Sequence, residues 1–243
     1  MRPLRSYDAI IAGASFAGLA VASQLRGNIL LIDKKPIGTG EASACGTFFS
    51  VLRELKCEKS VLQTFERVVF HCPVEVEFEL IDPLCTFDYE KFCQTLGERV
   101  KAEKIESLVR GVHDNTVVTD AGEFRSNCIV DCTGWRAILA SSLIKGFVNK
   151  KQLSTGLQTV APFRDDRLRF FVDPRIIEHG VAWVFPIGNA SRIGIASYAG
   201  KTNLFPELEK FVRNLGLEIG PIYGGCIPYG LRNPVVGNIF LVG

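Results

Sequence analysis

A glycine-rich turn near the N-terminus constrains the fold of this chain more than any other feature. The apolar run at residues 9–12 leads into Gly13, Ser15 and Gly18, and apolar residues then recur at helical spacing until a second apolar run ends at Asp33. This order of strand, glycine turn, helix, strand and acid is typical of a dinucleotide-binding βαβ unit. The glycines permit a tight turn and bring a pyrophosphate close to the helix N-terminus, and the acid accepts hydrogen bonds from ribose hydroxyls.

Ser15 stands where the middle glycine of this fingerprint is expected, so other interpretations have to be compared. Residues 13–17 imitate the Gly-x-Ser-x-Gly elbow of α/β-hydrolases, but that serine follows a mid-sheet strand, and the three histidines here lie in no pattern that marks a base. A secretory signal is disfavoured because Asp8 heads the apolar stretch and Asp33 has the ribose-acid spacing. The remaining alternatives are a βαβ unit with a purely structural role and the elbow.

Composition excludes several classes of function. The 243 residues suffice for one large domain or two interleaved ones, and 28 basic against 26 acidic residues, with no basic block, argue against a nucleic-acid partner. The uncharged stretch at residues 9–24 is too short and too polar to span a membrane. None of the eight cysteines forms a Cys-x-x-Cys pair, so neither a zinc knuckle nor a thioredoxin motif is supported. Several lie in apolar runs, where a free thiol packs as a small apolar residue, and this favours a reduced, cytoplasmic protein.

Beyond Asp33 the pattern predicts mostly short strands with a few helices. A small, polar loop is expected at residues 34–47, and alternation of apolar and acidic residues at 74–80 predicts a half-buried strand with a solvated acidic face. Helices are predicted at 51–62, at 87–96 with Asp88 as N-cap, and at 208–215. Further strands are predicted at 68–70, 107–112, 116–119, 128–132, 157–160, 170–172, 180–186, 192–197 and 238–243, and a turn at 225–230.

Several motifs together resemble the FAD-dependent oxidoreductases of the geranylgeranyl reductase family, within the group that shares the para-hydroxybenzoate hydroxylase fold. The motifs are the fingerprint at residues 8–33, Ser-Ala-Cys-Gly at 43–46, Phe-Asp at 87–88, Asp-Cys-Thr-Gly at 131–134 and Trp-Val-Phe-Pro at 183–186. Two features depart from the family pattern. The arginine that often precedes Phe-Asp is missing, and the aspartate and helix that follow the last strand would come after Gly243. The second departure predicts a fragment of a longer chain, or a truncated relative that binds flavin poorly.

The resemblance implies an α/β fold with a Rossmann-like, three-layer FAD-binding domain and an inserted antiparallel β-sheet substrate domain. The FAD-binding domain is expected at residues 1–70 and 85–150, with residues 225–243 returning to it. The substrate sheet is expected at residues 71–84 and 151–224.

The resemblance also implies roles for particular residues. Trp183 and Phe185 would form an apolar wall for a substrate, although both could equally be ordinary core. Cys45 would be a proton donor or a redox-active thiol, and its polar loop suggests that it is more exposed than the other cysteines. The residues expected to bind FAD are Gly13, Ala14, Ser15, Phe16, Ala17, Gly18, Asp33, Lys34, Ser43, Ala44, Cys45, Gly46, Thr133 and Gly134.

The implied reaction is hydride transfer from reduced FAD to a carbon–carbon double bond of an isoprenoid or other small apolar substrate. An external electron donor, NAD(P)H or ferredoxin, would reduce the flavin, and an apolar substrate could bring a cytoplasmic protein to a membrane surface. A flavin-dependent monooxygenase is the first alternative, and a truncated, flavin-free remnant without activity is the second. A halogenase is disfavoured, because residues 183–186 do not match the Trp-x-Trp-x-Ile-Pro pattern usual in that class.

Overall fold

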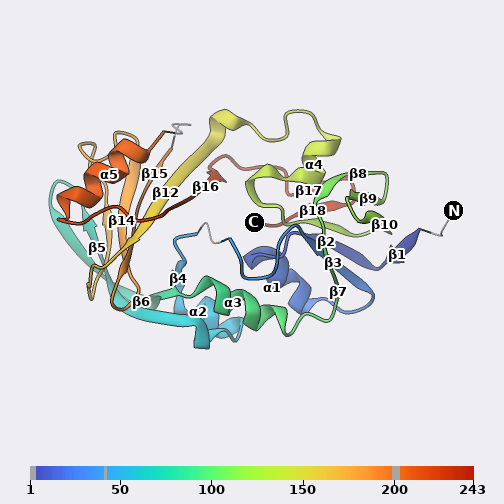
Figure 1. The fold of residues 1–243 in the computed structure, drawn as a ribbon, viewed down its shortest axis with the longest axis horizontal. Coiled ribbons are helices and arrows are strands. Elements are labelled where there is room, and N and C mark those ends of the chain that lie inside the picture. Colours follow the sequence, from blue (N-terminus) through green and yellow to red (C-terminus); the bar gives the residue numbers. More distant parts are fainter. Residues whose placement is uncertain (1–3, 41–42, 199–202) are drawn as a thin grey trace. The chain divides into compact units, whose positions relative to one another are not determined.

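The computed structural model describes residues 4–40, 43–198 and 203–243, and the chain forms two compact units. The first unit comprises Met1–Thr39, Cys93–Asn149 and Leu231–Gly243, and the second comprises Gly40–Phe92 and Lys150–Gly230 (Figure 1). This division differs from the boundaries expected from sequence, because residues 40–70, 85–92, 150 and 225–230 belong to the second unit. The strands within these segments belong to that unit's large sheet, so they cannot be separated from it.

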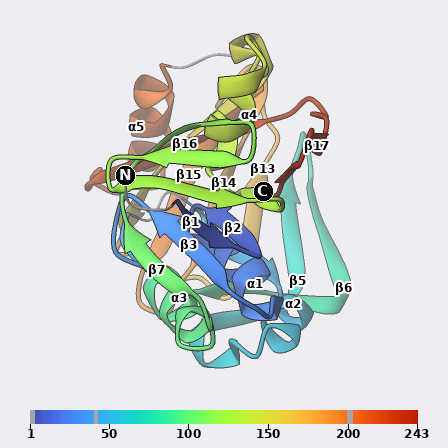
Figure 2. The ribbon, with the colours of Figure 1, turned by 90° about the vertical axis from the view of Figure 1, so that its right-hand side faces the viewer.

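A six-stranded sheet forms the centre of the first unit, in the order β17-β18-β11-β2-β3-β7. Its five parallel strands are β2 (Ala9–Ala12), β3 (Ile29–Asp33), β7 (Glu103–Glu106), β11 (Ile129–Asp131) and β18 (Ile239–Leu241), and β17 (Val235–Val236) runs antiparallel at one edge. All four residues of β2 are buried. A parallel strand covered on both faces needs such a continuous apolar run, and Figure 2 shows β2, β3 and β7 side by side.

Helix α1 (Phe16–Gln24) connects β2 to β3 and buries Gly18, Leu19 and Ala22. On the other face of the parallel sheet, Ile10 of β2 packs with Val117 and Phe124 from a four-stranded sheet. That sheet consists of β1 (Arg5–Tyr7), β10 (Gly122–Ser126), β9 (Thr116–Thr119) and β8 (Val109–His113), in this order. Successive side chains of a strand point to opposite faces, so β2 can contact α1 with one face and this sheet with the other. The expected layered Rossmann-like unit is confirmed.

The second unit is built on an eight-stranded sheet, which is antiparallel except between β13 and β5. In spatial order its strands are β16 (Ile222–Pro228), β12 (Leu153–Ala161), β15 (Ser191–Ser197), β14 (Gly180–Pro186), β13 (Leu168–Phe171), β5 (Val61–His71), β6 (Glu75–Phe87) and β4 (Gly46–Phe48). Helix α5 (Phe205–Asn214) covers one face, where Leu208 and Phe211 pack against Val184 and Ile193.

The remaining helices are short. They are α2 (Phe49–Glu54), η1 (Glu58–Ser60), η2 (Gly134–Arg136), α4 (Ile138–Leu143) and η3 (Lys150–Gln152). Helix α3 (Tyr89–Gly97) begins in the second unit and ends in the first. Its predicted N-cap is confirmed, because Asp88 Oδ1 accepts a hydrogen bond from the Lys91 amide at 2.9 Å.

Three predicted elements differ from the structure. The helix predicted at 51–62 ends at Glu54, because Lys56 takes a left-handed φ of +52° and β5 begins at Val61. The turn predicted at 225–230 lies largely in β16, which pairs with β12. The strand predicted at 74–80 exists as part of β6, but it is not half-buried, since Val76 and Phe78 are exposed as well as its acids. This part of β6 lies at the edge of the sheet, because β4 pairs only with residues 84–86 at the other end of the strand. The edge position explains the exposure.

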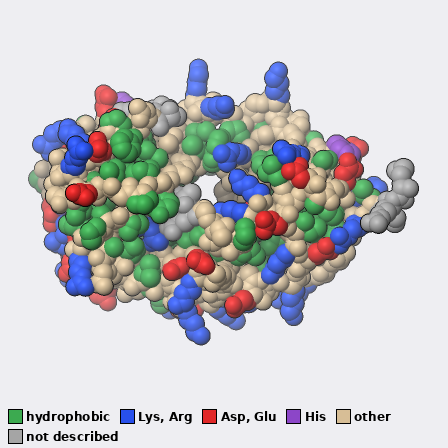
Figure 3. Space-filling view, in the orientation of Figure 1, with side chains coloured by type: hydrophobic (Ala, Val, Ile, Leu, Met, Phe, Trp, Pro, Cys, Tyr) green, Lys and Arg blue, Asp and Glu red, His purple; other side chains and the backbone are tan. Residues whose placement is uncertain are grey.

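No helix among the described residues is long and apolar enough to cross a membrane. Basic and acidic side chains are interspersed on the face shown in Figure 3.

Candidate functional site

The fingerprint glycines are required by close backbone contacts at the carboxyl end of β2. Gly13 has a φ of +105°, and a Cβ atom there would lie 2.2 Å from the carbonyl oxygen of Cys132. A Cβ atom on Gly18 would lie 1.7 Å from the carbonyl oxygen of Gly13. Only glycine fits either position, so the turn, the following helix and the end of β11 pack with backbone directly against backbone.

Asp33 ties this glycine turn to the end of β3. One carboxylate oxygen accepts a hydrogen bond from the Ala14 amide at 2.6 Å, and the other accepts one from the Lys35 amide at 3.2 Å. Each oxygen has a second lone pair, so the carboxylate can still accept hydrogen bonds from hydroxyl groups. Lys34, which follows it, is exposed.

A cavity of about 200 Å³ opens beside Asp33. Its lining residues come from the glycine turn, from β3 and the segment after it, and from β7: Ala14, Leu31, Asp33, Lys35, Pro36, Ile37, Lys104, Ile105 and Glu106. Sequence reasoning missed the β7 residues, because three charged residues and one apolar residue give too weak a strand signal. The one available signal was Ile105, a single apolar residue among charged ones. It is apolar because it pairs with Ile32 of the neighbouring parallel strand β3.

Asp131 organises the Thr-Gly turn that follows β11. Its buried carboxylate accepts hydrogen bonds from the Thr133 amide and hydroxyl, at 3.1 and 2.6 Å, and from the amides of Leu139 and Ala140, at 2.9 and 3.1 Å. The Thr133 hydroxyl in turn accepts one from Ile138. Asp131 therefore holds the turn and the start of α4 as one rigid piece.

The position of β2 brings these segments to one edge of the sheet. The chain leaves β2 for β3 on one side, and β11 pairs with β2 on the other, so the strand order reverses at β2. In open α/β sheets, ligands bind at the carboxyl ends of strands beside such a reversal. The turns that begin at Gly13 and Cys132 meet there, and Gly134, with a φ of +71° and open space at its Cβ position, leaves room for a ligand to approach the backbone.

Within the second unit, the structure brings the predicted Ser43–Gly46 loop to the predicted aromatic wall. The Gln158 Nε2 donates a hydrogen bond to the Ser43 carbonyl at 2.8 Å. Ala44 packs in the same apolar cluster as Trp183 and Phe185. A Cβ atom on Gly46 would lie 3.1 Å from the Phe185 ring. Sequence reasoning missed Gln158, which lies 115 residues from Ser43 in the chain and has no motif around it.

The prediction that Cys45 is an exposed thiol is wrong. Its side chain is 0% exposed, and its backbone has a left-handed φ of +49°. The Cys45 carbonyl accepts a hydrogen bond from the Phe87 amide at 3.0 Å, which holds the polar loop against β6. A polar loop can thus place one of its residues in the interior once its backbone is held by a neighbouring strand.

Two other cysteines are buried thiols with strongly raised pKa values. Burial, reinforced by the neighbouring Asp131 carboxylate, raises the pKa of Cys132 to about 12. Burial, reinforced by Asp82, raises the pKa of Cys85 to about 11. Both stay protonated at neutral pH and act as small apolar residues.

Trp183 and Phe185 belong to an aromatic cluster on the sheet face opposite α5. Phe185 meets Phe170 edge to face at 5.2 Å and lies 6.0 Å from the Trp183 ring. Phe170 stacks on Phe70 at 5.2 Å. Phe185 is buried and Trp183 is half-buried. Both side chains are therefore part of the core of this unit, and Trp183 also reaches its surface.

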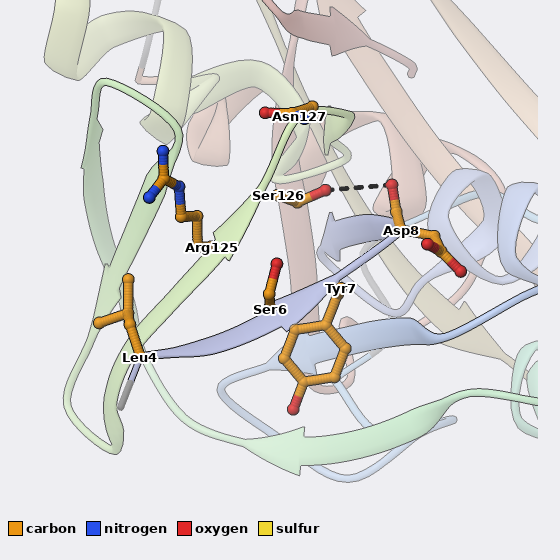
Figure 4. A pocket seen from close by; sticks show the side chains of 7 residues that line it. All are labelled: Leu4, Ser6, Tyr7, Asp8, Arg125, Ser126 and Asn127. Atoms are coloured by element: carbon orange, nitrogen blue, oxygen red, sulfur yellow. Dashed lines mark hydrogen bonds between the residues drawn. The ribbon is translucent and has the colours of Figure 1, made fainter. Parts of the chain in front are cut away.

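A second, polar hollow in the first unit contains none of the predicted site residues. Its volume is about 540 Å³, and it is lined by Leu4, Ser6, Tyr7, Asp8, Arg125, Ser126 and Asn127. Figure 4 shows the Ser126 hydroxyl donating to the Asp8 carbonyl, at 3.1 Å. The Asp8 carboxylate accepts a hydrogen bond from the Asn28 amide and so fixes the turn between α1 and β3. These hydrogen bonds stabilise the fold.

In the part of the chain that the structure describes, no cluster of His, Cys, Asp and Glu could hold a metal ion.

No protein-family model matches the sequence, and no curated protein matches it. Among solved structures, a geranylgeranyl bacteriochlorophyll reductase-like protein from Thermoplasma acidophilum matches 98% of this chain and 70% of its own, with a TM-score of 0.86 and 17% identity. The myxobacterial FAD-dependent halogenase CndH matches 98% and 68%, with a TM-score of 0.77 and 13% identity. The fold is that of the FAD-dependent oxidoreductases.

A mutant of P. aeruginosa PqsL gives a similar result, with a TM-score of 0.76 and 15% identity over 98% of this chain and 78% of that one. Identities at this level establish the flavoenzyme fold alone. The fold expected from the motifs is confirmed, and the roles of individual residues in this flavoenzyme fold stay predictions.

Proposed function

We propose that this chain binds FAD at the carboxyl edge of its parallel sheet and acts as an oxidoreductase that reduces a carbon–carbon double bond of an isoprenoid or other apolar substrate. The observation that carries the proposal is the backbone cradle in which Gly13 packs against Cys132, Gly18 packs against Gly13, and the glycine turn is tied to Asp33. Such a cradle is required where a pyrophosphate must approach a helix N-terminus.

The residues of the first unit fit the nucleotide half of FAD. Residues 14–17, with Gly13 and Gly18, would hold the pyrophosphate at the start of α1, which has no acidic residue in its first turn. Asp33 would bind the ribose, Lys34 would lie beside it, and the cavity of about 200 Å³ would take the adenine. Thr133 and Gly134 would flank the flavin end. Bound FAD would supply the hydride chemistry, and the protein would supply binding and orientation.

The second unit would supply the apolar wall for a hydrocarbon-like substrate. Trp183 and Phe185 would line it, and the Ser43–Gly46 loop, which packs on the same aromatic cluster, would contact the flavin ring. Cys45 as proton donor belongs to this proposal, and its burial means that only a group reaching inside the loop could receive its proton. An NAD(P)H or ferredoxin donor, a cytoplasmic location and contact with a membrane surface are proposed with it.

Cofactor binding is tested by titrating the purified chain with FAD and following the quenching of flavin fluorescence. Saturable binding of one FAD per chain is expected. An Asp33→Asn change should weaken affinity roughly 10- to 100-fold, since a hydrogen bond to a charged group contributes about 1.5–3 kcal/mol. Asp120→Asn is the matched control, because Asp120 pairs with Arg110 on the exposed part of the four-stranded sheet. Absence of binding to the wild-type chain would favour the flavin-free remnant.

The reaction is tested with reduced FAD and a prenyl substrate, once in the absence of oxygen and once in air. If the chain reduces a double bond, the saturated product should form in the absence of oxygen. Oxygen-dependent chemistry is the alternative, because solved structures with this fold include FAD-dependent halogenases. Oxygen uptake in proportion to an oxygenated or halogenated product would contradict the reductase proposal and leave FAD binding intact.

A further inference from the structure

Among the residues that the structure describes, two polar atoms on the aromatic face of the second unit are buried without a hydrogen-bond partner. They are the side-chain oxygen of Gln158 and the indole nitrogen of Trp183. Gln158 is only 4% exposed, and its orientation is fixed because its Nε2 donates to the Ser43 carbonyl, which leaves Oε1 as the unpaired atom. One atom is an acceptor and the other a donor. A buried, unpaired group of either kind is costly enough to require an explanation.

Both side chains lie on the same face of the sheet, on either side of Gly194. Gly194 of β15 pairs with Gln158 of β12 and also with Trp183 of β14, and directly paired residues point to the same face. A Cβ atom on Gly194 would lie 2.4 Å from Trp183 Cε2, the ring carbon bonded to the indole nitrogen. It would also lie 2.9 Å from the Gln158 Cβ. The side of the indole that carries Cζ2 and Cε2 therefore lies over Gly194, and Gln158 lies beside the same glycine.

The surroundings of the two atoms are apolar and small. Phe170 and Phe185 form the aromatic wall on one side, and Gly156, whose Cβ position lies 3.7 Å from the far end of the indole, leaves the other side without a side chain. This face is opposite the one that α5 covers. A donor and an acceptor set into an apolar wall fix the orientation of a ligand and select one that can satisfy both.

We propose that Gln158 and Trp183 form a hydrogen-bonding subsite for a group that both donates and accepts a hydrogen bond, such as the hydroxyl of an otherwise apolar substrate. The group would donate to Gln158 Oε1 and accept from Trp183 Nε1. This inference rests on the proposed function, because it assigns the substrate class of the same site. It narrows that class from hydrocarbons to apolar molecules that carry a hydroxyl or amide.

The test compares two probes that differ only in hydrogen-bond donation, geraniol and geranyl methyl ether. Isothermal titration calorimetry on the purified chain should show that geraniol binds roughly tenfold or more tightly than the ether, since a site built for a donor rejects the analogue that lacks it. Gln158→Leu and Trp183→Phe should each reduce this ratio severalfold. Trp183→Phe keeps the aromatic ring and the Gln158 bond to Ser43, so it reports on the indole donor without disturbing the loop.

Gln63→Leu is the matched control, because both amide atoms of Gln63 are already paired, with the Asp165 carbonyl and the Gly188 amide. It should leave the ratio unchanged. Equal affinities of the two probes for the wild-type chain, no binding of either, or an ordered water that bridges both atoms with geraniol bound would overturn the subsite. These outcomes are independent of the FAD titration. A subsite without FAD binding would refute the proposed function alone, and FAD binding with equal probe affinities would refute the subsite alone.

Discussion

Replacing Gly13 with alanine tests the claim that backbone contact at the glycine turn shapes the site. The first cost is conformational, since a non-glycine residue held at a φ of +105° is strained by about 1–3 kcal/mol. The second cost is steric. The new Cβ would lie 2.2 Å from the Cys132 carbonyl oxygen, so the ends of β2 and β11 must separate, and such overpacking costs a further ~1–3 kcal/mol. Gly13→Ala should therefore destabilise the chain by about 2–6 kcal/mol, much of a typical folding free energy.

Gly122→Ala separates the two costs. Gly122 has a comparable φ of +130°, but nothing lies within 4 Å of its Cβ position, so only the conformational cost applies. Urea unfolding should be followed by the fluorescence of Trp135 in a Trp183→Phe background, because Trp135 then reports on the first unit alone. Gly13→Ala should lower the free energy of unfolding by ~1–3 kcal/mol more than Gly122→Ala. Equal losses would show that the Cys132 contact does not constrain the turn.

Two further predictions concern buried carboxylates. Asp131→Ala should destabilise the first unit by about 2–4 kcal/mol, because buried donors lose their acceptor and α4 loses its cap, and Asp131→Asn should cost less since one acceptor oxygen stays. The same urea assay measures both, and equal unfolding midpoints for wild type and Asp131→Ala would contradict the capping role. Burial acts to raise the pKa of Asp165, but hydrogen bonds from the Arg169 side chain and the Arg167 backbone outweigh it, so the pKa is lowered overall. The ionised carboxylate therefore stabilises the folded state above its unfolded pKa of about 3.9, and this contribution is lost as pH falls through the lower folded value. Thermal unfolding between about pH 5 and 2 should show wild type losing more stability than Asp165→Asn, and parallel pH profiles would refute the assignment.

Sequence alone determined the local units whose signals lie within one turn or strand. The order from Gly13 to Asp33 specified strand, glycine turn, helix and acid, because side-chain periodicity and glycine conformational freedom act over a few residues. The N-cap at Asp88 was predictable for the same reason. The motifs at 131–134 and 183–186 were recognisable, although the pattern did not show that Asp131 would cap α4.

Tertiary structure decided which of these local units meet. The pairing of β11 with β2, the burial of Cys45 and the bond from Gln158 to Ser43 all depend on strands that are distant in sequence. The strands β7 and β16 gain their stability from pairing with neighbouring strands rather than from the strand propensity of their own residues, so neither was predicted from sequence. The glycine turn was thus readable from the chain, but the contact with Cys132 that makes its first glycine indispensable exists only after the sheet has formed.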